Sequence, residues 1–224
     1  MNRLQALWDS SVGKKTVMAV TGLIGVLFVI GHMVGNLQVF QGAERINAYG
    51  HLLHGPLNEL LWVARGVLLL AVVAHVVAAS QLTLRDKAAR PIGYARQVPQ
   101  VSTLASRTMR GGGVLLLLFI VVHILHFTTG TIRPTGVFTA GDVYANLVSG
   151  FRVPWVTAFY VISMLALGLH LYHGAWSSFR SLGAASPSPQ PLRRQLALVI
   201  AIVVSVGFAL VPVAALAGLV GGPR

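Results

Sequence analysis

Four histidines stand in parts of this sequence that are otherwise strongly apolar. His32, His75, His123 and His170 each lie well inside a different long hydrophobic segment. An imidazole in an apolar environment needs a partner, so histidine inside such segments is uncommon and points to function. Imidazole nitrogen binds iron, copper and zinc well. These four residues therefore favour ligation of a metal or a metal-containing cofactor.

Five apolar segments are long enough to carry these histidines across a membrane. The chain has 224 residues, of which 55% are hydrophobic and 10% charged, whereas soluble domains have about 25% charged residues. Its mean hydropathy is +0.74. A helix of roughly 20 apolar residues spans a hydrocarbon core of ~30 Å. We expect an all-α integral membrane bundle, a single domain over 1–224, with transmembrane helices at about 16–40, 56–84, 108–130, 154–179 and 196–219.

The basic residues predict how these helices are oriented. The net charge is +12, and twelve of the 17 lysines and arginines fall at the N-terminus and in the loops after the second and fourth segments. Cytoplasmic loops of membrane proteins carry such an excess. We therefore expect a cytoplasmic N-terminus, a C-terminus outside and no nucleic-acid partner. The long basic loop from Arg85 to Arg110 is a candidate docking surface for another protein.

The alternating direction of the helices sorts the four histidines by depth. His32 and His123 lie slightly beyond the middle of outward-running helices, which places both in the outer half of the membrane. His75 and His170 lie past the middle of inward-running helices, which places both in the inner half. At ~1.5 Å per residue the two pairs differ in depth by roughly 10 Å. Two histidines at one depth can hold a flat haem between them, so the pattern predicts two haems.

Ligation by two histidines decides the chemistry of such a haem. Both axial positions of the iron are filled, which leaves electron transfer as its role. The chain has no cysteine, which excludes covalent c-type attachment and iron–sulfur ligation by this chain, so the haems are expected to be of the b type. The alternative is that the histidines hydrogen-bond across the bundle without a cofactor. The pairing of all four by depth favours haem.

Further polar residues lie near the helix ends. His126 and His173 each follow a predicted ligand by three residues, about one helical turn. They are candidates for contact with haem propionates or a quinone, although an interfacial position explains them as well. Several cations could contact the propionates of an inner haem, namely Arg180, Lys14, Lys15, Arg107 and Arg110. A role in setting the membrane orientation alone would explain the same residues. The five acidic residues all lie in loops or near helix ends, so no carboxylate relay crosses the bundle.

Several short motifs carry a family resemblance that covers nearly the whole chain. The chain resembles the cytochrome b membrane anchor of succinate dehydrogenases and fumarate reductases, in the single-chain, five-helix, two-haem form. Four ligand-bearing helices followed by a ligand-free fifth are the most specific part of this resemblance. The motifs are Gly31-His32-Met33-Val34-Gly35-Asn36, Asn47-Ala48-Tyr49-Gly50-His51, Ala74-His75, Val122-His123, and His170 followed by Gly174-Ala175-Trp176-Ser177 and Phe179.

This resemblance implies a place in a respiratory enzyme complex of the tricarboxylic acid cycle. In such complexes a flavoprotein containing FAD oxidises succinate, and an iron–sulfur subunit relays the electrons. The anchor binds these subunits on the cytoplasmic side of the bacterial cytoplasmic membrane and passes electrons to a quinone, usually menaquinone. The chain would perform the quinone half-reaction and no succinate chemistry. His75 and His170 would hold the inner, proximal haem, and His32 and His123 the outer, distal haem.

The resemblance leaves two possible locations for the quinone site. It also leaves open whether the whole complex forms a higher oligomer. An outer site near the distal haem would use residues from Asn36, Arg45, His51, His54, His126 and Arg133. His51 matches a histidine in the first outer loop of the family. An inner site near the iron–sulfur subunit would have Lys14, Lys15 and Trp176 within reach.

Two other interpretations remain beside the main one. The bundle could hold two haems but serve another membrane dehydrogenase, such as a hydrogenase or formate dehydrogenase, whose cytochromes place more than one ligand on some helices. It could also be a haem-free anchor or a transporter whose histidines line a polar path, and it would then be colourless.

Overall fold

The computed structural model describes residues 2–89, 103–184 and 191–222, and within these ranges it consists of helices and turns. Five helices are long and apolar enough to cross a membrane, which confirms the predicted fold class. They are α2 (Ser11–Leu37), α4 (Asn58–Ala88), α5 (Leu104–His123), α7 (Pro154–Ser181) and α8 (Pro191–Leu216). The orientation of the termini and the division into one domain stay predictions, and the inner and outer ends of the bundle are named after this predicted orientation.

Capping residues explain why two helices begin earlier than the apolar pattern predicts. Helix α2 begins at Ser11 because the hydroxyl of Ser10 accepts the N–H of Gly13 at 2.8 Å. Helix α5 begins at Leu104, where Thr103 accepts the N–H of Ser106 at 3.2 Å. Both caps are polar residues beyond the apolar run, which is why hydropathy alone places the starts too late.

One proline lies at a helix start, and another lies in the turn before a helix. Helix α7 begins at Pro154 as predicted, and proline suits this position because the first helical N–H needs no partner. Pro56 does not start a helix, since it lies in the turn before α4, which begins at Asn58. Pro212 lies inside α8.

The outer ends of two spans depart from α-helical geometry. Helix α2 continues into the short 3-10 helix η1 (Gln38–Gln41), and α5 continues into the π-helical segment η2 (Ile124–Thr128). Single π-helical turns often mark functional sites. His123 directly precedes η2, and His126 lies within it.

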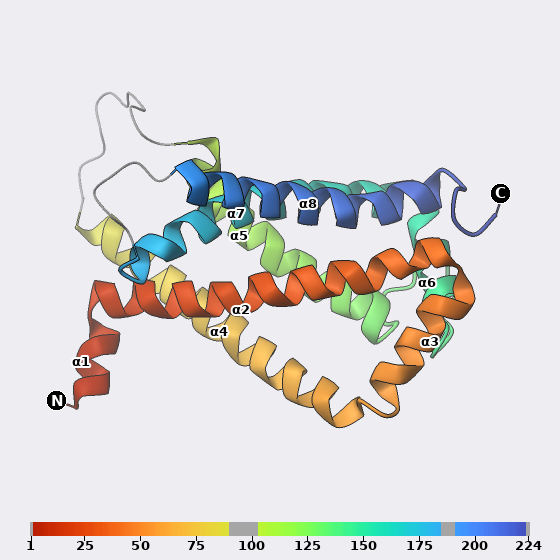
Figure 1. Cartoon of the computed structure of the whole chain (residues 1–224), viewed down its shortest axis with the longest axis horizontal. Coiled ribbons are helices and arrows are strands. Elements are labelled where there is room, and N and C mark those ends of the chain that lie inside the picture. The colour runs from red at the N-terminus through yellow and green to blue at the C-terminus, as the bar shows by residue number, and fades with distance from the viewer. Residues whose placement is uncertain (1, 90–102, 185–190, 223–224) are drawn as a thin grey trace.

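Three short helices lie where the apolar pattern predicts no helix. Helix α1 (Arg3–Asp9) lies at the N-terminal end of α2, whereas α3 (Ala43–His54) and α6 (Val143–Phe151) lie at its other end (Figure 1). Helices α3 and α6 are joined through Asn47, whose side chain donates to Asp142 Oδ1 and accepts from the N–H of Tyr144, both at 3.0 Å. These contacts make the outer loops a structured cap on the bundle.

The long helices pack in a definite pattern. Helix α7 packs against α8, α5 and α2, and α2 also packs against α4. Helix α4 crosses α2 near its inner end and inclines away from it toward α3 (Figure 1). Large apolar side chains such as Leu69, Leu70 and Val114 remain exposed on these helices. An apolar exterior is what a bilayer requires of a spanning helix.

The predicted docking loop is only partly described. Residues 90–102 of the segment from Arg85 to Arg110 lie outside the described residues. At its ends, Arg110 forms an exposed ion pair with Asp86 at 3.1 Å, and Arg85 donates to the Asp9 carbonyl at 2.8 Å. The second contact connects α4 to the end of α1.

Candidate functional site

The structure brings the four membrane histidines together as two pairs. The ring centroids of His32 on α2 and His123 on α5 are 5.8 Å apart, with an interplanar angle of 82°. Those of His75 on α4 and His170 on α7 are 6.2 Å apart, with an angle of 53°. These are the two pairs expected from helix direction and depth. Their role as haem ligands stays a prediction.

Each pair joins two helices that lie across the bundle from one another. Among the four histidine-bearing helices, the closely packed pairs in the described residues are α2 with α4, α5 with α7, and α2 with α7. The histidine pairs instead connect α2 to α5 and α4 to α7. The imidazoles therefore meet between helices whose backbones are not in extensive contact, which is where a group held by two side chains has room.

The spacing of the rings fits ligation of one metal from two sides. A metal–imidazole bond is about 2 Å long, so two imidazoles on opposite sides of one ion have their centroids about 6 Å apart. The observed values are 5.8 and 6.2 Å. In the described residues, no group of three or more histidine and carboxylate side chains is arranged around a bare metal ion. Haem needs only two protein ligands, and the residues present fit it.

The inner pair has small neighbours and one hydrogen-bonded ring. Thr21 Oγ1 lies 3.1 Å from His75 Nδ1. A Cβ at Gly22 would lie 3.5 Å from His75 Cε1, and one at Gly113 would lie 3.9 Å from His170 Cε1. His170 Nδ1 is buried and makes no hydrogen bond within the described structure. The two rings of the inner pair therefore differ in their hydrogen bonding.

The outer pair is enclosed by aromatic side chains. Phe28 stacks on His32 at 5.3 Å, and Phe208 of α8 lies 5.7 Å from the same ring. Phe119 stacks on His123 at 5.6 Å, and Phe127 lies edge-on to it at 5.8 Å. Apolar surroundings of this kind exclude water and favour the neutral form of both rings.

Tyr160 connects His123 to a third histidine. Its hydroxyl lies 3.1 Å from His126 Nδ1 and 3.5 Å from His123 Nδ1, so the contact with His126 is the stronger hydrogen bond. His126 is buried, with 5% of its surface exposed, and it stacks on Phe127 at 3.9 Å. A Cβ at Gly150 would lie 2.7 Å from His126 Nε2, so glycine is what allows α6 to approach this ring.

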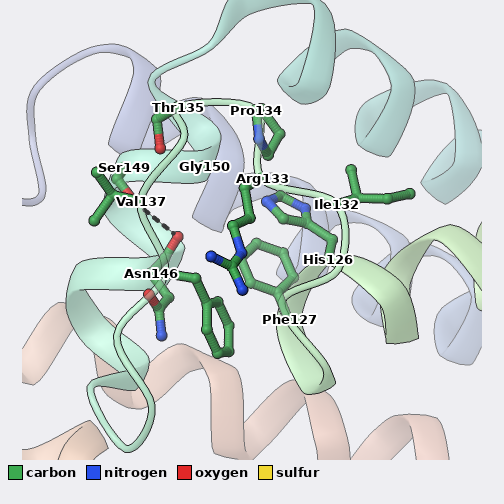
Figure 2. Close-up of a pocket in the computed structure, with 11 residues that line it drawn as sticks. His126, Phe127, Ile132, Arg133, Pro134, Thr135, Val137, Asn146, Ser149 and Gly150 are labelled. Atoms are coloured by element: carbon green, nitrogen blue, oxygen red, sulfur yellow. Dashed lines mark hydrogen bonds between the residues drawn. The ribbon is translucent and has the colours of Figure 1, made fainter.

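A small pocket opens beside His126 at the outer end of the bundle. Figure 2 shows its lining residues, which include His126 and Phe127 of η2, Arg133 of the following loop, and Asn146 and Ser149 of α6. Its empty space is about 210 Å³ when the open solvent at its mouth is included, and the enclosed part has room for about one water molecule. A ligand would therefore enter this pocket with only part of its structure.

The predicted quinone residues do not all meet at this pocket. Arg133 and His126 line it, whereas the other predicted residues in the described structure do not. Their positions are as follows: Asn36 donates to the His32 carbonyl at 2.7 Å, His54 contacts the Gly50 carbonyl at 3.0 Å and Arg65 at 3.4 Å, and both His51 and Arg45 are exposed on α3.

The inner candidate residues are largely engaged with their neighbours. Lys14 is buried, donates to the Trp8 carbonyl and lies 4.5 Å from the centre of the Trp8 ring. The Arg194 guanidinium lies 5.0 Å from the Trp176 ring. Lys15 and Arg180 are exposed, and His173 is half-buried on α7. Arg107 and Arg110 lie in the first two turns of α5.

One carboxylate outside the membrane spans has a perturbed acidity. The N–H of Ala145 and the side chain of Asn47 both donate to Asp142 Oδ1 at 3.0 Å. These donors stabilise the ionised form and hold the pKa of the Asp142 carboxyl below its ordinary value of 3.8. Asp142 therefore caps α6 as an anion at neutral pH.

Comparison with known proteins identifies the family of this chain. Residues 86–210 match the family model described as succinate dehydrogenase/fumarate reductase transmembrane subunit. The succinate dehydrogenase cytochrome b558 subunit of Bacillus subtilis (strain 168) is 24% identical over 189 residues, which cover 82% of this chain and 88% of that protein. No solved structure gives a significant match. With five membrane-spanning helices and a match over more than half its length, the chain belongs to the cytochrome b membrane subunits of the succinate dehydrogenase and fumarate reductase family.

Proposed function

We propose that this chain holds two haem b groups and passes electrons from an iron–sulfur partner subunit to a quinone. His75 and His170 hold the inner haem, and His32 and His123 hold the outer one. The carrying observation is that all four rings meet as two pairs, 5.8 and 6.2 Å apart, across opposite helices of the bundle. Ring centroids about 6 Å apart also occur between ordinary aromatic neighbours, so the support comes from four membrane histidines meeting as two such pairs.

The residues of the chain define what each site does. Bound haem supplies one-electron transfer, and two histidine ligands leave no axial position for oxygen or substrate. Phe28, Phe119 and Phe208 exclude water around the outer pair, which favours neutral imidazoles that can act as ligands. At the inner pair, Gly22 and Gly113 keep side chains away from the rings.

The quinone is expected at the outer end, where His126 and Arg133 line the pocket. His126 lines the pocket, and Tyr160 holds its Nδ1. Its Nε2 can therefore form a hydrogen bond with a quinone oxygen. Arg133 adds a cation that would favour a partly reduced, negatively charged ring. The resemblance to two-haem anchors makes menaquinone the expected quinone. His51, His54, Asn36 and Arg45 lie outside the pocket and are assigned no contact with the ring.

The partner subunits are expected on the inner side. FAD and the iron–sulfur clusters are expected in the flavoprotein and iron–sulfur subunits. The inner end presents α1, the ion pair of Arg110 with Asp86, and the exposed Lys15 and Arg180. These charged groups suit a polar protein surface better than lipid tails.

A haem measurement on the purified protein tests the proposal. The chain is expressed with haem available, and haem is quantified per chain as the pyridine haemochrome beside a reduced-minus-oxidised spectrum. We expect about two b-type haems per chain. A folded preparation without haem would overturn the proposal and favour a haem-free anchor.

Single histidine variants test the pairing. His75→Ala and His170→Ala should each remove the same spectral component, and His32→Ala and His123→Ala should each remove the other. His54→Ala is the matched control, because His54 is exposed on α3, and it should retain both haems. If a variant of one pair depleted the component of the other while keeping its own, the assignment of ligands would be wrong.

A further inference from the structure

We propose that Thr21 is a positioning residue for the inner haem, because its hydroxyl fixes the tautomer and the orientation of His75. This inference rests on the proposed function, since it concerns a residue that acts on a haem ligand. Thr21 lies on α2 and His75 on α4, two helices that pack against each other, and their side chains meet at 3.1 Å.

The direction of this hydrogen bond follows from the other contacts of the threonine. The Thr21 hydroxyl donates to the Val17 carbonyl at 2.7 Å, with the Met18 carbonyl more distant at 3.3 Å. A hydroxyl has one hydrogen, so with that hydrogen directed at Val17 it can only accept from His75. The contact with Thr21 therefore requires that Nδ1 of His75 carries the proton.

A protonated Nδ1 leaves the lone pair on Nε2. An imidazole that ligates a metal commonly donates its other N–H to a neighbour, which fixes the tautomer and the ring plane and makes the ligating nitrogen more basic. Thr21 supplies that neighbour for His75. Without it, the ring could take the opposite tautomer, in which Nε2 carries the proton and cannot bind iron.

The two ligands of the inner pair differ in this respect. His75 is held by an acceptor on a neighbouring helix, whereas Nδ1 of its partner His170 is buried without a hydrogen bond in the described structure. In the inner pair, a side chain therefore orients only the ring of His75. At the outer pair the corresponding contact, from Tyr160 to His123, is longer at 3.5 Å.

The test compares variants of Thr21 in the whole protein with both haems bound. Thr21→Val keeps the shape and removes the acceptor, Thr21→Ala removes it without a branched side chain, and Thr21→Ser restores the hydroxyl. Thr16→Val is the matched control, because Thr16 makes the same bond to a carbonyl four residues earlier, that of Val12 at 3.1 Å. The readouts are haem content, the midpoint potential of each haem and the low-spin electron paramagnetic resonance spectrum.

We expect both oxygen-free variants to bind the inner haem more weakly, by about 10- to 100-fold. The inner haem that remains should have a more positive midpoint potential, because a less basic ligand stabilises ferric iron less. The outer haem, Thr21→Ser and Thr16→Val should all match the wild type. Wild-type potentials and spectra for the inner haem in Thr21→Val and Thr21→Ala would overturn the inference while leaving two haems per chain. Absence of haem from the wild type would instead overturn the proposed function, and the inference with it.

Discussion

Individual side chains hold the histidines of this protein in different ways. The inner ring of His75 has a near acceptor in Thr21, whereas the hydroxyl of Tyr160 is shared between His126 and His123 at the outer end. One hydroxyl can donate only a single hydrogen, so the shorter contact, with His126, is the stronger hydrogen bond. Tyr160 is therefore mainly a structural partner of the buried His126.

Removal of that hydroxyl should destabilise the outer end. Tyr160→Phe leaves His126 Nδ1 buried without a partner, and a buried unsatisfied polar group costs about 1–3 kcal/mol. We expect a lower midpoint of thermal unfolding for the detergent-purified protein. Tyr172→Phe is the control, because it removes a hydroxyl from the same helix at a residue that packs against the Met33 cluster.

A double variant separates this bond from general packing. Tyr160→Phe combined with His126→Phe should cost less than the sum of the two single changes, because both remove the same hydrogen bond. Purely additive effects would show that the 3.1 Å contact does not stabilise the protein.

The sequence reaches part of this residue-scale picture. Helix direction and depth predict which histidines meet, because they depend only on a rise of ~1.5 Å per residue. The sequence did not point to Thr21 or Tyr160. Each lies on a helix that carries a ligand of one pair, but at the depth of the second pair. Thr21 is eleven residues before His32, and Tyr160 is ten residues before His170. Which of several polar residues at that depth touches a ring depends on helix rotation, which the sequence alone does not define.

At the scale of elements, the approach of α6 to the π-helical segment η2 depends on one glycine. Gly150→Ala would place a methyl group against the rigid ring of buried His126, and overpacking of this kind costs about 1–3 kcal/mol. We expect a lower unfolding temperature and a disturbed outer pocket. Gly174→Ala is the control, because a Cβ there would meet nothing within 4 Å. Equal stability of the two variants would contradict the close packing of α6 on η2.

The cap of α6 should make the stability of the outer loops depend on pH. The Asp142 pKa is lowered in the folded protein, so the stability that this carboxylate contributes is present in full above 3.8 and is lost as pH falls through the lowered pKa. Asp142→Asn still provides a side-chain oxygen for the cap but does not titrate. The wild type should be the more stable of the two near neutral pH, and thermal unfolding at decreasing pH should bring them together. A constant difference would show that another group is responsible.

The helices illustrate what hydropathy does and does not predict. The five spans follow from long apolar runs, whereas α3 and α6 were missed because they are short. Helix α3 also carries charges, including Glu44 and Arg45, and it is held by Asn47 and Asp142 from separate outer loops. Such contacts link residues that are far apart in sequence, so no local sequence pattern predicts them.

For the whole molecule, the distribution of cations predicts the orientation in the membrane. The chain has no cysteine, so a single introduced one reports its own side of the membrane. Val137→Cys and Leu182→Cys place thiols at exposed positions, 64% and 43% accessible, near opposite ends of the bundle. In intact spheroplasts an impermeant maleimide should label the first and should reach the second only after permeabilisation. The reverse pattern would invert the predicted topology, and the cysteine-free chain is the blank.

The position of helix α4 indicates that the proposed cofactor would also stabilise the fold. This helix packs on α2 and meets α3 at its outer end (Figure 1). Its His75 lies opposite His170 of α7, with the ring centroids 6.2 Å apart. A group bound by both histidines would tie α4, which packs mainly against α2, to α7 as well, and ligand binding stabilises the folded state by mass action. Cells short of haem would then lose the polypeptide itself to membrane quality control, so that cofactor supply would set how much of the subunit accumulates.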